Sequence, residues 1–176
     1  MNRLFRASLL LCTLALSACG FHLRQSAALP TSMQRMHLTV SGGGSLQRDL
    51  ARALEDSGVT IEDQGGPGIA ELKVPVASFD TDTLSVSGGA RVTEYSVRYQ
   101  GRFEVDDSNG QPLITQQRID MSRDFSYDAL NTVGTDAQVE EIRRSLNDDM
   151  VQAILFRLQA AGRHPVAAPA AASSAG

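Results

Sequence analysis

The sequence predicts an α+β fold, a two-layer sandwich in which one sheet is covered on one face by two helices. Three observations support this prediction. The elements follow the order strand, helix, strand, three long strands, helix. The strands alternate apolar and polar residues, and both helices carry apolar stripes at helical spacing. No internal repeat appears, and one domain of this length can bury a core.

The first half of the folded part contains one helix between two short strands. Residues 36–40 alternate apolar and polar side chains, which predicts a strand. Leucines recur every fourth residue over 46–57, with Ser45 as the expected N-cap and Gly58 as the expected terminator. This pattern predicts an amphipathic helix of about three turns. Residues 59–61 form a brief second strand.

Three longer strands follow. Residues 70–76 alternate, and Pro75 indicates an edge strand or a bulge because proline donates no backbone hydrogen bond. Residues 94–105 form the clearest strand, with apolar odd-numbered positions and polar even-numbered ones. Asn109-Gly110 predicts a tight turn into a returning strand over 113–127. The two strands therefore pair antiparallel.

A final helix closes the domain. Apolar residues recur at helical spacing between Val139 and Leu158. Thr135 or Asp136 is the expected cap, and Gly162 and Pro165 end the pattern. This helix and the first one supply the layer that covers the sheet, whose other face stays open or meets a partner.

The amino terminus is typical of an exported lipoprotein. Positive charge precedes an apolar run of about 11 residues, too short for a membrane-spanning helix of about 20. The run ends in Leu16-Ser17-Ala18-Cys19, which resembles a lipobox. The resemblance implies that residues 1–18 are a cleaved signal peptide and that Cys19 carries lipid. The alternatives are an ordinary signal with a cysteine at the cut, or a buried structural thiol.

The expected mature chain divides into three parts. Residues 19–32 form a lipidated tether, 33–162 the folded domain, and 163–176 a disordered Ala/Pro-rich tail. Gly20 stands where an Asp retains many Gram-negative lipoproteins in the inner membrane, so the resemblance implies the outer membrane, facing the periplasm.

Charge and cysteine content argue against nucleic-acid-binding proteins and disulfide-bonded domains. The net charge of −4 becomes −6 once the two leader arginines are removed. An acidic chain without a basic stripe argues against a nucleic-acid partner. Cys19 is the only cysteine of the expected mature chain, so no intramolecular disulfide forms.

Motifs for catalysis or metal binding are missing. "VSGGGSLQRDL" leads from a strand through glycines into a helix, but it lacks the lysine and hydroxyl of a phosphate loop. A tight turn is the simpler interpretation. The histidines and cysteines do not occur in pairs at ligand spacing, and no nucleophile lies beside a base. We expect no enzyme, no metal and no cofactor.

Arginines gather on the long strands and on the loop that leads into them. They are Arg91, Arg98, Arg102, Arg118 and Arg123. Guanidinium groups suit phosphate or carboxylate, so an anionic ligand or partner is one interpretation. The other is that these charges solubilise the surface and pair across strands with Glu94, Glu104 and Asp120.

The chain resembles the LptE family of lipopolysaccharide (LPS) assembly lipoproteins. The resemblance is carried by "CGFHLR" from Cys19, "TDTLSVSGGARVTEYSV", "RDFSYD" from Arg123 and "DDMVQAILFRL" near the end. It implies two helices on a mixed four-stranded sheet. It also implies a protein that sits inside the outer-membrane barrel LptD, helps that barrel assemble, and binds LPS.

Two residues are assigned to LPS by this resemblance. Family members contact LPS with basic residues before the Glu-Tyr strand and on the strand that ends in Arg-Asp-Phe. Here these positions give Arg91 and Arg118. A different class of function is a generic periplasm-facing lipoprotein that binds cell-wall glycan or another envelope complex.

Overall fold

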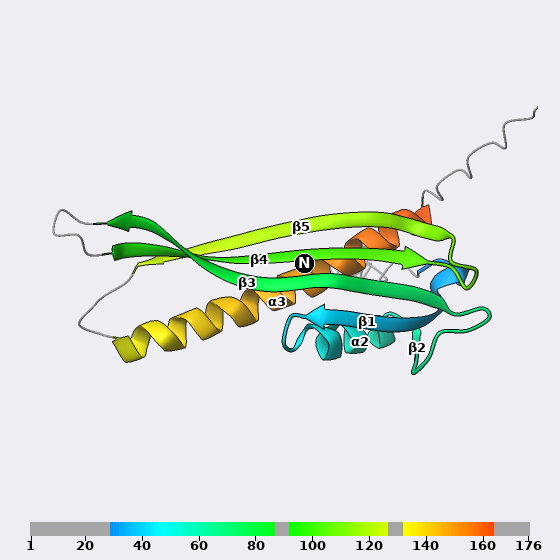
Figure 1. Ribbon diagram of the computed structural model, residues 1–176. Coiled ribbons are helices and arrows are strands. Elements are labelled where there is room, and N and C mark those ends of the chain that lie inside the picture. Colours follow the sequence, from blue (N-terminus) through cyan, green and yellow to red (C-terminus); the bar gives the residue numbers. More distant parts are fainter. Residues whose placement is uncertain (1–28, 87–91, 127–131, 164–176) are drawn as a thin grey trace, which may run out of the picture.

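A layer of strands and a layer of helices make up the protein (Figure 1). The computed structural model describes residues 29–86, 92–126 and 132–163. Its elements are η1 (Thr31–Met33), β1 (Arg35–Gly42), α2 (Leu46–Asp56), β2 (Thr60–Glu62), β3 (Ala70–Val86), β4 (Val92–Asp106), β5 (Pro112–Ser126) and α3 (Thr132–Arg163). The α+β prediction is confirmed. Cys19, Arg91 and the predicted leader and tail lie outside the described residues.

The sheet is mixed and open, with the strand order β2-β1-β3-β4-β5. β1 pairs parallel with both β2 and β3, whereas β3-β4 and β4-β5 are antiparallel. The sheet has five strands, one more than the family resemblance implies. The additional strand is β2, which pairs only at three positions, from Arg35↔Thr60 to His37↔Glu62.

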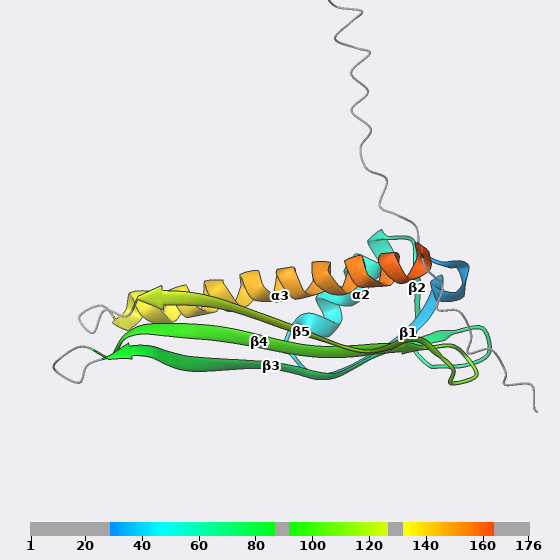
Figure 2. The same ribbon diagram turned by 90° about the horizontal axis from the view of Figure 1, so that it is seen from above.

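Both helices cover the same face of the sheet, as the view in Figure 2 shows. α2 buries Leu46, Leu50 and Leu54 completely, which confirms the predicted stripe. Gly58 ends this helix with a φ of +87°, as expected of a glycine terminator. Ser45 precedes α2, but its side chain makes no capping hydrogen bond. The reason is that its hydroxyl donates to the Asp49 carboxylate instead.

The core lies between the sheet and this helical layer. From β4, the odd-numbered residues Val97, Tyr99, Phe103 and Val105 are 0–1% exposed, as the alternation predicts. α3 contributes Leu146, Met150, Ile154 and Leu158. Gly101 fits beneath Met150, because a Cβ there would lie 2.8 Å from the Met150 sulfur. The face of the sheet toward the helices is therefore apolar and buried, and the opposite face carries mainly polar residues.

β3 is the central strand of the sheet, so the edge-strand interpretation of Pro75 is wrong. The bulge interpretation is right, because the β3–β4 register shifts between Lys73 and Val76. A bulge leaves one residue out of the ladder, and proline has no N–H to lose there. The strand then runs on to Val86, ten residues beyond the predicted end.

α3 is longer than its apolar stripe. It begins at Thr132, so the predicted caps Thr135 and Asp136 lie within its first turns. Residues 136–138 are exposed, so this part of the helix needs no apolar pattern. Among the described helices, none is both long and apolar enough to cross a membrane.

Candidate functional site

The sheet face away from the helices is polar along its whole length. On β4, and on β5 from Arg118 to Ser126, the even-numbered side chains point to this face, and β3 adds Asp80 and Asp82. We call it the open face. Its charged members include Lys73, Asp80, Asp82, Arg98, Arg102, Glu104, Arg118, Asp120 and Asp124.

Arg118 lies on the open face, where its side chain is 55% exposed. Its Nε donates to Asp120 Oδ2 at 2.7 Å, two residues along the same strand. This bond to Asp120 raises the pKa of the Arg118 guanidinium. The surface-charge interpretation names Asp120 as a partner but expects the pair across strands, whereas this bond runs along one strand.

Arg102 is directly opposite Arg118 across the β4–β5 ladder. It is exposed and forms no ion pair with any described residue. Like charges opposed across strands destabilise a sheet unless counter-charge approaches them. The open face thus holds two adjacent guanidinium groups, of which Arg118 is bonded to Asp120 and Arg102 has no ion-pair partner among the described residues.

Two more of the arginines on the long strands, Arg98 and Arg123, already form ion pairs. Arg98 reaches Asp82 on β3 at 2.7 Å. Arg123 belongs to the helical side of β5 and binds Asp149 of α3, also at 2.7 Å. These partners differ from Glu94 and Glu104, because diagonal and interlayer neighbours are closer than the sequence pattern reveals. Neither arginine is available to a ligand without breaking a bond.

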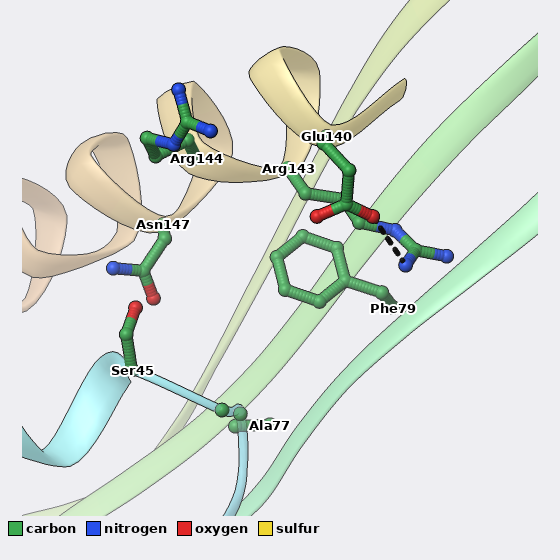
Figure 3. Close-up of a pocket in the computed structure, with 9 residues that line it drawn as sticks. Ser45, Ala77, Phe79, Glu140, Arg143, Arg144 and Asn147 are labelled. Atoms are coloured by element: carbon green, nitrogen blue, oxygen red, sulfur yellow. Dashed lines mark hydrogen bonds and ion pairs between the residues drawn. The ribbon is translucent and has the colours of Figure 1, made fainter. Parts of the chain in front are cut away.

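A pocket of about 360 Å³ lies on the other side of the sheet, where α2, α3 and β3 meet (Figure 3). We call it the α2–α3 pocket. It is lined by Gly43, Gly44, Ser45, Ala77, Phe79, Glu140, Arg143, Arg144 and Asn147. Three parts of the chain that are distant in sequence thus form its walls.

Asn147 supplies a buried polar group to this pocket. The residue is 4% exposed, and its Nδ2 donates to Asp49 Oδ2 at 2.9 Å. Its Oδ1 accepts no hydrogen bond from any described residue, and Figure 3 shows it pointing toward the Ser45 hydroxyl. That hydroxyl donates to Asp49, and this bond is the main cause of the lowered pKa of the Asp49 carboxyl. One hydroxyl proton thus faces two acceptors.

Phe79 forms the apolar wall of the pocket. Its ring stacks on Tyr99 with centroids 3.8 Å apart and planes 8° from parallel. The Arg143 guanidinium lies 5.9 Å from the Phe79 centroid and donates to Glu140 Oε1 at 3.2 Å. An aromatic surface beside an ion pair and an amide oxygen offers both apolar and polar contact.

Tyr99 behind Phe79 is fully buried, and its hydroxyl has no partner among the described residues. Burial raises the pKa of this phenol to about 12. Replacing it, Tyr99→Phe, removes an unsatisfied polar group and keeps the ring. We expect the free energy of unfolding to rise by about 1 kcal/mol, measured by urea denaturation. A loss of 1 kcal/mol or more would mean that the hydroxyl is hydrogen-bonded.

The family model described as LptE, lipopolysaccharide-assembly, matches residues 33–158. This stretch contains α2, all five strands and α3 as far as Leu158. The chain belongs to the LptE lipopolysaccharide-assembly family. The match begins at the residue where the folded domain was predicted to begin.

Individual relatives agree with the LptE assignment. The LPS-assembly lipoprotein LptE of Photorhabdus laumondii is 26% identical over 89% of this chain and 86% of its own length. The LptE of Pectobacterium atrosepticum is 27% identical over 89% of this chain and 85% of its own length. Lipoprotein B of Nitrosomonas europaea has the same fold, with a TM-score of 0.69, 24% identity, and coverage of 80% and 91%. A minor lipoprotein of Acinetobacter baumannii gives a TM-score of 0.63 at 25% identity, and the match covers 80% of this chain and 100% of that one.

Sequence reasoning found only part of what this LptE-family chain displays. It named Arg118, which the structure places on the open face, and Arg91, which is outside the described residues. It missed the special position of Arg102, since that depends on the strand register. It also treated "SGGGS" as a turn alone, although Gly43, Gly44 and Ser45 line a pocket. The available signal was Asn147, a polar residue beside the apolar stripe of α3.

Proposed function

We propose that this protein is an outer-membrane lipoprotein that works with the barrel LptD to assemble LPS at the cell surface. It plugs the LptD lumen, helps the barrel assemble, and binds LPS. Membership of the LptE family and the names of its relatives support this role.

The open face is the observation that carries the proposal. A sheet whose second face is charged along three long strands needs either water or a polar partner against it. The lumen of a large outer-membrane barrel is polar, so such a face fits there without desolvating unpaired charge against lipid. The apolar face, by contrast, is already covered by α2 and α3.

Lipid on Cys19 supplies the anchor in this proposal. Several acyl chains hold a protein stably at a membrane, because each buried methylene adds about 0.8 kcal/mol. Of the predicted tether 19–32, Leu29 is buried in the core and Thr31 begins η1, which leaves 19–28 as the linker in this proposal. At about 3.3 Å per extended residue, these residues let the domain reach about 33 Å from the lipid. The anchor thus sets the membrane and leaves the docking geometry to the domain.

Co-purification tests the partnership. The full chain, isolated in mild detergent, is expected to carry a barrel protein of the LptD type at equal stoichiometry. Recovery of a lone monomer would overturn the partnership. Recovery on a cell-wall glycan resin after a salt wash, without a barrel protein, would favour the generic lipoprotein function instead.

The arginines give the second test. We propose that Arg91 and Arg118 contact LPS phosphate or acidic sugar, with Arg102 beside Arg118. Replacing Arg118 and Arg102 together by alanine is expected to weaken LPS binding by about tenfold or more at low salt, because charge-assisted hydrogen bonds are lost. Adding Arg91→Ala should weaken it further.

Arg35→Ala is the matched control for these variants. Arg35 is exposed and paired with Glu62 at 2.8 Å, on the far β1–β2 side of the sheet. Its loss should leave LPS affinity within about twofold. Equal affinities for all variants at low salt would remove the open-face arginines from the LPS site.

A further inference from the structure

The α2–α3 pocket has no role in the proposed plug or in the arginine pair. Its most specific feature is the Asn147 amide. The Asp49 carboxylate accepts hydrogen bonds only, so the amide must turn its Nδ2 toward Asp49. Its Oδ1 then lies toward Ser45 at the pocket wall, and it accepts no hydrogen bond from any described residue because the Ser45 hydroxyl donates to Asp49. A molecule that satisfies it must bring an O–H or N–H group.

Glu140 adds a second acceptor at the rim. Its carboxylate lines the pocket above Phe79 and is held by Arg143 at 3.2 Å (Figure 3). A carboxylate has more acceptor positions than one guanidinium bond uses. Arg143 and Arg144 also line the pocket, and the buried Arg143 Nε has no hydrogen-bond partner among the described residues. Acceptors and donors that face one space favour a ligand with several hydroxyl groups, because each hydroxyl can both donate and accept.

Phe79 completes the set. Its ring is half-buried, backed by Tyr99, and forms part of the pocket wall. The adjoining wall is made by Gly43 and Gly44, and open space surrounds the position of a Cβ at Gly44. A flat ligand with an apolar face and polar edges suits an aromatic wall opposite hydrogen-bonding groups.

We propose that the α2–α3 pocket binds a saccharide ring whose hydroxyls donate to Asn147 Oδ1 and Glu140 while its apolar face lies on Phe79. The pocket volume of about 360 Å³ is within the range of small-molecule sites. The saccharide is assigned to the sugar portion of LPS, and this assignment rests on the proposed function. The open face is then left for the phosphates and the barrel.

Nuclear magnetic resonance of the full mature chain in detergent tests the site. The probes are lipid-free oligosaccharide released from LPS by mild acid, and soluble glycan fragments of the cell wall. Saturable shifts are expected for the backbone amides of Gly43 and Gly44 and for the side-chain amide of Asn147. The LPS oligosaccharide should produce them and the cell-wall fragments should not.

Two exposed glutamates provide a matched pair of variants. Glu140→Ala removes the rim acceptor and should weaken oligosaccharide binding by about tenfold. Glu141→Ala deletes the neighbouring carboxylate, which pairs with Arg144 in the same i,i+3 manner but does not line the pocket. The affinity of the Glu141→Ala variant for the oligosaccharide should stay within about twofold of that of the unsubstituted protein. Gly44→Asn is the second variant, since asparagine tolerates the φ of +57° and fills the space.

Each result decides between the site and the function. No saturable shift, or unchanged affinity in both Glu140→Ala and Gly44→Asn, overturns the saccharide site. If intact LPS binds without shifting the pocket amides, the saccharide site is overturned and the proposed function still stands. Oligosaccharide binding in the pocket without binding of intact LPS supports the site and overturns the function. Binding of cell-wall fragments alone supports a saccharide site and overturns its assignment to LPS.

Discussion

Replacing Phe103 by alanine is expected to lower the free energy of unfolding by about 3–5 kcal/mol. Phe103 is 1% exposed and lies on β4 beneath the helical layer. Its loss removes a large apolar side chain and leaves a cavity, because the sheet behind it cannot collapse into the space. Urea or guanidinium denaturation of the two proteins, followed by circular dichroism, measures the difference.

Phe156→Ala is the control for that experiment. Phe156 is 62% exposed on α3, so the same substitution there removes little buried area. Its effect should stay within about 0.5 kcal/mol. Similar losses for the two variants would contradict the assignment of the core to the sheet–helix interface.

Gly43→Ala is expected to lower the free energy of unfolding by about 2–5 kcal/mol. Gly43 has a φ of +74°, which costs an alanine roughly 1–2 kcal/mol, and overpacking adds about 1–3 kcal/mol. The new methyl would lie 2.7 Å from the Ala77 Cβ and 3.2 Å from the Tyr99 hydroxyl. The Ala77 carbon is fixed to the central strand and has no rotamer with which to move away.

The neighbouring glycine separates the two contributions. Gly44 also has a positive φ, of +57°, but a Cβ there meets no atom within 4 Å. Gly44→Ala should therefore cost only the backbone part, about 1–2 kcal/mol. The difference between the two variants, from thermal or denaturant unfolding, measures the close approach to β3. Equal losses of stability for the two variants would show that Ala77 moves away from the added methyl group.

Local patterns were enough to predict the layers of this fold. The alternation of β4 determined which residues are buried, because a two-residue period leaves only one choice of face. The leucine spacing of α2 did the same for its stripe. These features depend on neighbours within a few residues, which a single sequence displays directly.

The strand register could not be predicted in this way. A regular hairpin that pairs Asp106 with Pro112 would place Gln116 opposite Arg102. Two register shifts between Asp106 and Phe103 displace β5 by two residues and bring Arg118 there instead. The displacement keeps the same face outward, so the hydrophobic pattern does not reveal it. The pairing of Arg102 with Arg118 could therefore not be predicted, although the sequence pointed to both arginines.

The pocket was hidden for a related reason. Asn147 satisfies half of its amide with Asp49, 98 residues earlier in the chain. No spacing rule links two such positions, since their approach depends on how α3 packs across α2. Ser45 was predicted as a helix cap on local preference, and the competing carboxylate one turn later changed its partner.

The way in which the pocket is assembled has a consequence for folding. The β3–β4 and β4–β5 hairpins join neighbouring segments and close short loops, so they are the parts that form early. The pocket needs the glycine turn before α2, the middle of β3 and the third to fifth turns of α3 together. It therefore exists only after the most distant contacts have closed. A chain halted with its hairpins formed lacks the pocket, which makes sugar binding a readout of complete maturation.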